Sequence, residues 1–274
     1  MTFWRGKPGR PGVVARSVGL GILLLVLAGC AARPPVIAPT PVPVPEKLPW
    51  TAAIGQLSIL QGGGRPCTAV LVASDLIVTA AHCLYQEGRA APPTSVVFHP
   101  NFGAQPELGQ YRGATIRAIG SVVRQGRITK GSEVAADWVL LSIDPPVRAI
   151  EPVPVARLTT QQILDQLANG ADLFTAGYGY GATKVLRPHG KCRIVSPREN
   201  KAAQFPSMLV TDCIIRIGDS GGPIALLDKS GRPSLIGIFS GFGVNGQTGL
   251  AFGSNASNFA PYLDSLLISQ WLGS

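Results

Sequence analysis

Short apolar runs rich in Val, Ile, Leu, Thr and Phe follow one another from residue 54 to residue 252. Glycine, proline and polar residues separate them, which is typical of short strands joined by turns. Long helical patterns do not alternate with these runs, so a parallel α/β sheet is disfavoured. The pattern predicts an all-β barrel or sandwich. We expect its strands at Ile54–Leu60, Thr68–Ala73, Leu76–Ala80, Ser95–His99, Thr115–Val123, Trp138–Ile143, Leu173–Gly177, Lys191–Val195, Met208–Ile215, Pro223–Leu227, Ser234–Ser240 and Thr248–Phe252.

Two segments have helical patterns instead. Thr159–Leu167 begins with a capping residue, carries a Leu/Ile stripe and stops at an Asn-Gly pair. Phe259–Trp271 repeats apolar residues at helical spacing and predicts a helix near the C-terminus. The proline-rich stretch Asp144–Ala156 divides the strand series into two halves, which show no convincing repeat.

The first thirty residues differ in composition from the rest. Four basic residues precede an uncharged apolar run, Val18–Ala28, which has the length of a secretory signal. The run leads into Leu27-Ala28-Gly29-Cys30, which resembles the lipobox of bacterial lipoproteins. This resemblance implies a signal peptide at 1–29 and a lipid on Cys30. The alternatives are an ordinary signal peptide with a chance cysteine, or an uncleaved anchor.

A proline-rich segment follows the cysteine, and we interpret residues 30–49 as a tether. Proline at this density favours extended polyproline II geometry, so a semi-rigid spacer is favoured over a ligand for an aromatic groove. We expect an exported protein held at the cell envelope by its lipid. If the envelope has two membranes, Ala31 after the cysteine points to the outer membrane.

Composition and charge narrow the function classes. Of the 274 residues 46% are hydrophobic and 14% are charged, which predicts a folded core. The formal net charge is +9, and removal of the four basic residues before Cys30 lowers it to +5. Basic clusters interleaved with aromatic residues are not seen, so nucleic-acid binding is disfavoured.

The cysteine count agrees with export. With Cys30 assigned to lipid, four cysteines remain, and an exported compartment permits disulfides. Four cysteines allow three pairings, and the sequence alone does not choose one. Because each pair flanks apolar stretches that could be neighbouring strands, Cys67–Cys83 and Cys192–Cys213 are favoured.

Candidate chemistry is concentrated at Gly218-Asp219-Ser220-Gly221-Gly222-Pro223. Small neighbours leave the serine hydroxyl exposed and let main-chain N–H groups converge on the group that it attacks. Such a loop can hold a nucleophile and an oxyanion site, but serine needs a base and the base needs an orienting partner.

A base and an orienting carboxylate are both available. His82 follows a β-branched strand and two alanines, whereas His99 and His189 lie beside prolines in less distinctive loops where structural roles fit. Asp137 precedes a strongly apolar run, and a carboxylate buried there requires a hydrogen-bonding partner. The alternative is an aspartate that merely begins the strand in solvent.

Residues 79–83, 137–141 and 218–223, in this order, resemble the motifs of the chymotrypsin/trypsin-like serine proteases. The resemblance covers about residues 50–274. It implies an all-β fold of two six-stranded antiparallel β-barrels, about 50–150 and 151–274, with a C-terminal helix.

The same resemblance implies a role for each motif residue. Ser220 would be the nucleophile, His82 the base and Asp137 its orienting partner, while the N–H groups of Gly218 and Ser220 would form the oxyanion hole. The family pattern also supports a Cys67–Cys83 bridge beside the histidine.

Specificity departs from the trypsin pattern. Family members that cleave after basic residues carry an aspartate six residues before the serine, where this chain has Ile214, followed by Ile215. Ser240, Gly241 and Phe242 resemble the strand of the pocket wall. We expect these five residues to line a pocket for small or medium apolar side chains, not for Arg or Lys.

The features of activation also differ from those of animal members of the family. Animal members pair the aspartate before the nucleophile with a freed Ile-Val-Gly-Gly terminus, and this chain has no such tetrapeptide. We therefore expect Asp219 to find another cation or hydrogen-bond donors, as in bacterial members. Activity should not need a cut near Trp50–Ile54.

The sequence thus predicts an exported serine endopeptidase that hydrolyses proteins or peptides through an acyl-enzyme. A catalytically inactive protease-fold binding protein and an esterase with the same triad remain as alternatives. No cofactor is implied, and the scattered cysteines and histidines do not form a zinc motif. We expect a monomer that contacts the membrane through the lipid on Cys30.

Overall fold

A computed structural model describes residues 48–60, 66–86, 89–120, 131–179, 185–200, 203, 205–245 and 248–273. All of them belong to one compact unit, Thr40–Ser274. The expected signal peptide, Cys30 and nearly all of the tether lie outside the described residues. Within the described part, no helix has both the length and the apolar character needed to span a membrane.

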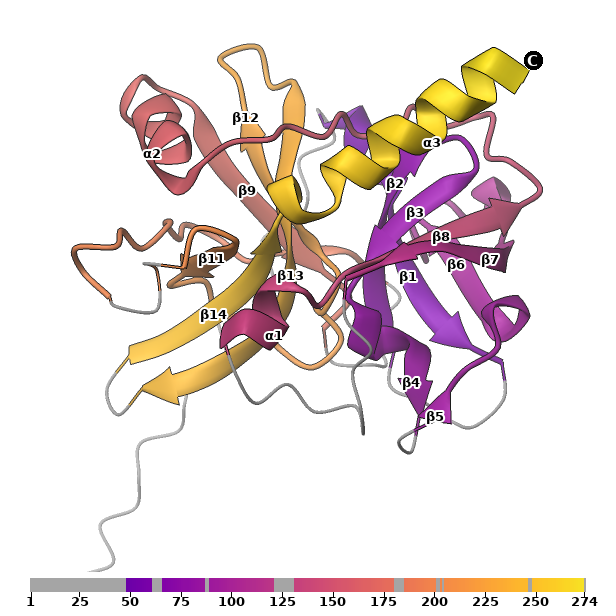
Figure 1. Cartoon of the computed structure of the whole chain (residues 1–274), viewed down its shortest axis with the longest axis horizontal. Helices are drawn as coiled ribbons and strands as arrows, with labels where there is room; N and C mark the ends of the chain where they lie inside the picture. Colours follow the sequence, from indigo (N-terminus) through magenta and orange to yellow (C-terminus); the bar gives the residue numbers. More distant parts are fainter. Residues whose placement is uncertain are drawn as a thin grey trace, which may run out of the picture. The chain divides into compact units, whose positions relative to one another are not determined.

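Six antiparallel strands close into a barrel in the first half of the unit, drawn from indigo to magenta in Figure 1. Strands β2 and β3 are buried along their whole length. Their side chains share one core with Leu235 and Ile238 of the second half, so they carry contacts between the halves. In the order of the circle the strands are β1 (Ile54–Ile59), β2 (Cys67–Ala73), β3 (Leu76–Thr79), β8 (Val139–Asp144), β7 (Tyr111–Ile119) and β6 (Val96–Pro100).

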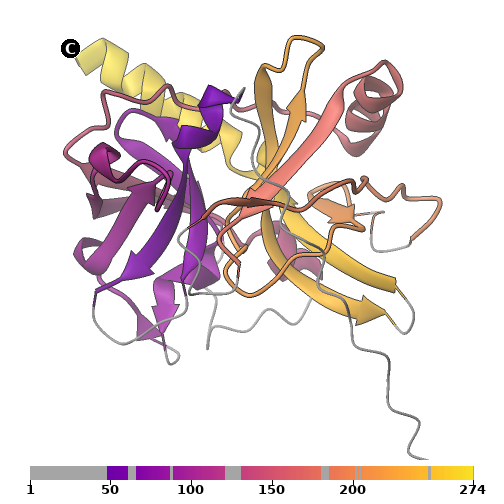
Figure 2. The same cartoon turned by 180° about the vertical axis from the view of Figure 1, so that it is seen from behind.

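The second half is a six-stranded antiparallel sheet, drawn in orange and yellow and seen from behind in Figure 2. After β10 the chain returns to the opposite edge of this sheet, where Ile194 bridges to Thr211 and the Val195 N–H donates to the Val210 carbonyl at 2.8 Å. The sheet thereby curls back on itself. In sheet order its strands are β10 (Arg187–Pro188), β9 (Asp172–Gly177), β12 (Pro223–Leu227), β13 (Pro233–Asn245), β14 (Thr248–Asn255) and β11 (Met208–Thr211).

This architecture confirms the predicted fold class, although regular pairing closes only the first barrel. The expected strand Lys191–Val195 is wrong, because only Ile194 forms a bridge, and the expected strand Met208–Ile215 ends at Thr211. The physical reason is side-chain chemistry. The Asp212 carboxylate accepts the Arg193 N–H at 2.7 Å, and a disulfide joins the neighbouring cysteines, so side chains replace the ladder there.

Several short elements carried no sequence signal that we interpreted. They are a two-stranded ribbon of β4 (Tyr85–Gln86) and β5 (Arg89–Ala90), the helix α1 (Gly131–Ala135), and 3-10 turns at Pro49–Ala53, Ala81–Leu84, Pro93–Ser95, Pro106–Leu108 and Ala256–Asn258. Each spans two to five residues, which is too short for a periodic pattern.

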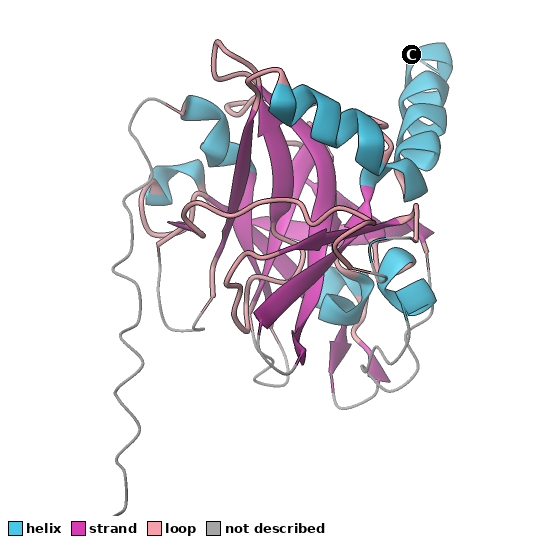
Figure 3. Cartoon of the chain, turned by 90° about the vertical axis from the view of Figure 1, so that its left-hand side faces the viewer, coloured by secondary structure: helices cyan, strands magenta, loops and turns pink. Residues whose placement is uncertain are grey.

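Both predicted helices are present, and they lie around the strands rather than between them (Figure 3). Thr159 caps α2 (Thr160–Ala168) through a capping box with Gln162. The first turn of α3 (Ala260–Gly273) packs on the first barrel, where Leu263 is buried and the rings of Trp138 and Phe259 have centroids 6.1 Å apart. The C-terminal helix therefore ties the end of the chain to the strand that follows Asp137.

Candidate active site

Strand pairing brings His82 and Asp137 together. His82 lies in the 3-10 turn after β3, and Asp137 lies two residues before β8. These strands are antiparallel neighbours with Thr79 opposite Val139, so the end of one lies beside the start of the other. Two buried alanines, Ala80 and Ala81, let the turn pass close to the barrel.

The two side chains are hydrogen-bonded. His82 Nδ1 lies 2.7 Å from Asp137 Oδ2, and the His82 main-chain N–H donates to Oδ1 at 2.9 Å. Asp137 is fully buried, and the Ser240 hydroxyl from the second half also donates to its Oδ2. The carboxylate thus has the partners that burial requires. With Nδ1–H directed at Asp137, the ring presents Nε2 as an acceptor.

Ser220 lies on the loop before β12. Its hydroxyl donates to the Ser240 carbonyl at 3.4 Å, so the nucleophile candidate lies beside the strand that supports Asp137. A serine hydroxyl rotates to suit its partners. Hydrogen bonds between a nucleophile and its base often tighten only when substrate is bound.

The loop around Ser220 leaves two N–H groups available. The N–H groups of Asp219, Gly221 and Gly222 donate to main-chain carbonyls, whereas those of Gly218 and Ser220 have no partner among the described residues. Gly218 has φ +108°, a conformation that a side chain would strain. Two free donors on one tight loop can stabilise an oxyanion.

Thr68 of β2 fastens this loop to the first barrel, a role that the sequence did not suggest. Its hydroxyl donates to the Gly218 carbonyl at 2.8 Å and accepts the Tyr178 N–H at 3.0 Å, while its own N–H donates to the Ser220 carbonyl at 2.8 Å. Gly221 fits there only without a side chain, because a Cβ would lie 2.1 Å from the Thr68 carbonyl. A threonine beside Cys67 carries no pattern that reveals this contact.

The expected pocket residues separate into two groups. Ile215 is 6% exposed and packs in the second core, whereas Ile214 is exposed. Phe242 on β13 is 54% exposed, and Gly241 faces open space. Ile217, which the sequence did not single out, is also exposed, three residues before Ser220.

The disulfides join Cys67 to Cys83 and Cys192 to Cys213, the pairs that the sequence favoured. The first lies beside the histidine, with Cys83 Sγ 4.0 Å from His82 Nε2. Ligand-type atoms of Cys67, His82 and Cys83 lie within 4.8 Å of one another. Because a disulfide has no thiolate to offer, this cluster is not suited to a metal ion.

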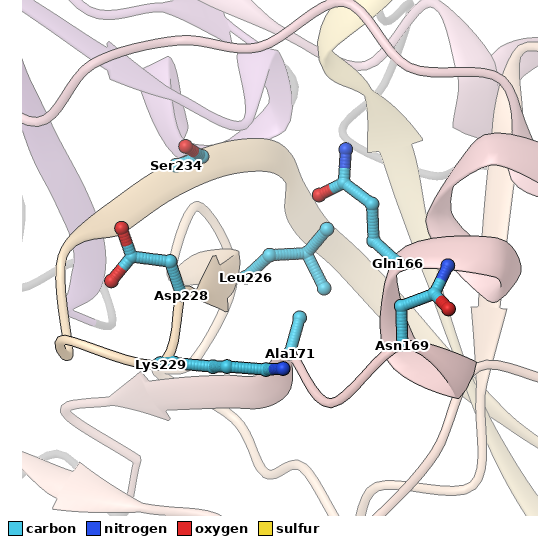
Figure 4. A pocket seen from close by; sticks show the side chains of 7 residues that line it. All are labelled: Gln166, Asn169, Ala171, Leu226, Asp228, Lys229 and Ser234. Atoms are coloured by element: carbon cyan, nitrogen blue, oxygen red, sulfur yellow. The ribbon is translucent and has the colours of Figure 1, made fainter.

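A cavity of about 250 Å³ opens at the end of α2, beside the turn between β12 and β13 (Figure 4). Its lining combines polar side chains with Ala171 and Leu226 and includes none of the site residues described above. Asp228 at its edge is held within its own turn by Ser230 and Arg232, and these hydrogen bonds lower the pKa of its carboxyl group. The cavity is lined by Gln166, Asn169, Ala171, Leu226, Asp228, Lys229 and Ser234.

Comparisons with known proteins agree with this geometry. Residues 42–263 match the profile of the family described as Trypsin. The chain belongs to the trypsin family. Kallikrein-1E2 of Equus caballus is 23% identical over 203 residues, which cover 70% of this chain and 72% of that protein. This trypsin-family chain also resembles the crystal structure of a scabies mite inactivated protease paralogue, S-I1. The TM-score is 0.58 at 14% identity, with 81% of this chain and 96% of the other covered, so this likeness shows the fold alone.

Thr68→Val tests whether the threonine hydroxyl fastens the loop. The change keeps the side-chain volume but leaves the Gly218 carbonyl and the Tyr178 N–H without their partner. We expect the free energy of unfolding to fall by about 1–3 kcal/mol and kcat to fall with it. Urea unfolding and peptide hydrolysis measure the two effects.

Thr160→Val is the matched control, since the buried Thr160 hydroxyl has no partner among the described residues. Removing this hydroxyl should leave stability unchanged or raise it. Equal losses in the two variants would contradict the role of Thr68.

Proposed function

We propose that this protein is a serine endopeptidase in which Ser220, His82 and Asp137 form the catalytic triad. The observation that carries the proposal is the buried Asp137 carboxylate, which accepts hydrogen bonds from both His82 and Ser240 beside Ser220. A general base needs an imidazole with one ring nitrogen hydrogen-bonded to a carboxylate and the other available to substrate. The partly exposed ring of His82, bound to Asp137 through Nδ1, has this arrangement.

The chemistry follows from these positions. Ser220 Oγ attacks the scissile carbonyl as His82 Nε2 takes its proton, and the carbonyl oxygen becomes an oxyanion between the N–H groups of Gly218 and Ser220. His82 then protonates the leaving amine, the C–N bond breaks and an acyl-enzyme remains. Water, deprotonated by His82, then attacks the acyl carbon, the bond to Ser220 Oγ breaks, and His82 returns the proton to Oγ as the acid leaves. Each oxyanion donor is worth about 3–4 kcal/mol in such enzymes, and Asp137 stabilises the imidazolium.

Ser220→Ala tests the nucleophile. A fluorophosphonate probe should label the purified full chain and not this variant, and casein hydrolysis should fall at least about 1,000-fold. Ser257→Ala, which alters a serine in the 3-10 turn before α3, is the control and should react as the wild type does.

The outcomes also separate the alternatives. Labelling without peptide hydrolysis would favour an esterase. Absence of labelling in the wild type would favour an inactive binding protein, a possibility raised by the name of the inactivated scabies mite paralogue. The complete set of Ser220, His82 and Asp137 supports the enzyme instead.

We further propose that the substrate pocket accepts apolar side chains. Ile214, Ile217 and Phe242 are each at least half exposed and come from the two segments that flank Ser220. In the described residues no carboxylate takes the place of Ile214, so a basic side chain would find no counter-charge there. Ile215 is assigned to the core and not to the pocket wall.

A library of peptide substrates tests this specificity. We expect the highest kcat/KM for small or medium apolar residues before the cleaved bond, and Ile214→Asp should shift the preference toward Arg and Lys. Dominant cleavage after Arg or Lys by the wild type would contradict the assignment.

We propose that the protein is exported and attached to the cell envelope by a lipid on Cys30. The two disulfides favour an oxidising compartment, and Cys30 follows a secretory-type apolar run.

Cys30→Ala tests the lipid. The wild type should require detergent for release from the membrane fraction, whereas the variant should be released without it. A variant that stays membrane-bound would favour an uncleaved anchor, and a wild type that needs no detergent would favour an ordinary signal peptide.

A further inference from the structure

The carboxylate of Asp219, next to the proposed nucleophile, is buried and 3% exposed. Its Oδ1 accepts the Gly179 N–H and its Oδ2 accepts the Arg216 N–H, each at 2.7 Å. Two main-chain donors do not neutralise a buried negative charge, and such a charge is costly unless it is paired. The position therefore calls for a further donor or cation.

The backbone at the end of β9 fits closely around this carboxylate. A Cβ added at Gly177 would lie 2.3 Å from Asp219 Oδ1, and one added at Gly179 would lie 2.7 Å from it. Tyr178 between them is fully buried, and burial raises the pKa of its phenol, so the side chain stays neutral. A phenol has no cationic form and cannot supply a counter-charge to Asp219. Both glycines leave room for the carboxylate alone.

His189 supplies the missing partner. Its side chain is 5% exposed, and its Nε2 lies 3.1 Å from Asp219 Oδ2. Within the described residues Nε2 makes no hydrogen bond of good geometry, and the Asp219 carboxylate is the ionisable group within its reach. The two atoms are within contact distance but are not aligned as an ideal hydrogen bond.

Three further contacts hold the His189 ring in this place. Its Nδ1 lies 3.1 Å from Thr175 Oγ1, and its main-chain N–H donates to the Thr175 carbonyl at 3.0 Å. The ring packs edge-on against Phe239, with centroids 5.4 Å apart. The residue follows β10, which pairs with β9 and so brings it beside Asp219.

We propose that His189 is a positioning residue that holds the oxyanion loop in its active form through Asp219. The proposal rests on the function proposed above. The Asp219 N–H donates to the Arg216 carbonyl at 3.0 Å and its carbonyl accepts the Gly222 N–H at 2.8 Å, so an anchored carboxylate fixes the peptide groups on either side of it. The peptide after Asp219 carries the Ser220 N–H, and the peptide before Asp219 is joined through the Gly218 Cα to the one that carries the Gly218 N–H. A partner within the chain makes a freed N-terminus unnecessary for the same purpose.

Three substitutions of His189 separate the effect of its Nε2–H donor from the effect of its side-chain volume. Gln places an amide nitrogen near the position of Nε2, Asn places one nearer Nδ1, and Phe keeps the ring without a donor. We expect kcat to fall about tenfold to a hundredfold in His189→Phe and His189→Asn, with KM changed less than about threefold, because the loss falls on the oxyanion donors. His189→Gln should stay within about threefold of the wild type.

His99→Phe is the matched control. His99 also packs on an aromatic ring, with centroids 5.1 Å from Phe102, but it lies on β6, and among the described residues no side-chain hydrogen bond or ring contact joins it to Ser220, His82, Asp137 or Asp219. Its kcat should be unchanged. Thermal unfolding of each variant shows whether a loss of activity results from a loss of folding. If His189→Phe folds poorly, the comparison of His189→Gln with His189→Asn remains the test.

A double-mutant cycle with Asp219→Asn shows whether His189 acts through Asp219. In the Asp219→Asn background, which lacks the carboxylate, adding His189→Phe should lower kcat by less than about threefold. Additive losses, equal activity of the Gln and Asn variants, or full activity of a folded His189→Phe would each overturn the proposal. A wild type that is neither labelled by fluorophosphonate nor able to hydrolyse peptides would instead overturn the proposed function.

Discussion

A buried carboxylate, Asp219, lies on the loop that carries Ser220 and accepts a hydrogen bond at each of its oxygens. It lies against a strand end that has glycine on both sides of Tyr178, and its two oxygens take main-chain donors from residues on either side of the loop. A negative charge in such a place is stable only with its full set of partners. The conformation of the loop, and with it the direction of the Gly218 and Ser220 N–H groups, is therefore coupled to the contacts of the Asp219 side chain.

The site also depends on contacts between the two halves of the unit. Thr68 of the first barrel binds the Gly218 carbonyl 150 residues away, and Ser240 of the second half donates to Asp137 across 103 residues. Neither half holds a complete site by itself. Packing of β2 and β3 against Leu235 and Ile238 brings these polar groups within reach, so the hydrophobic core and the geometry of the candidate site are parts of one arrangement.

Local patterns in the sequence predicted the elements that depend on local chemistry. Alternating apolar runs located most strands, the Thr159 cap located α2, and the motifs around His82, Asp137 and Ser220 identified the residues that the structure brings near one another. Thr68 and His189 were missed because their roles come from long-range contacts, and a lone threonine or a histidine beside a proline carries no local signal. The strand expected at Met208–Ile215 failed where a disulfide and the Asp212 carboxylate replace the sheet ladder, which periodicity cannot reveal.

The central claim is that the loop around Ser220 is active within an uncut chain, because Asp219 finds its partners inside the fold. Mass spectrometry of the full-length protein after reaction with a fluorophosphonate tests this claim most directly, since it reports the mass of the chain and the labelled residue together. We expect one phosphonate on Ser220 of a chain that has not been cut near Trp50–Ile54. Labelling that appears only after such a cut, or on another residue, would contradict it.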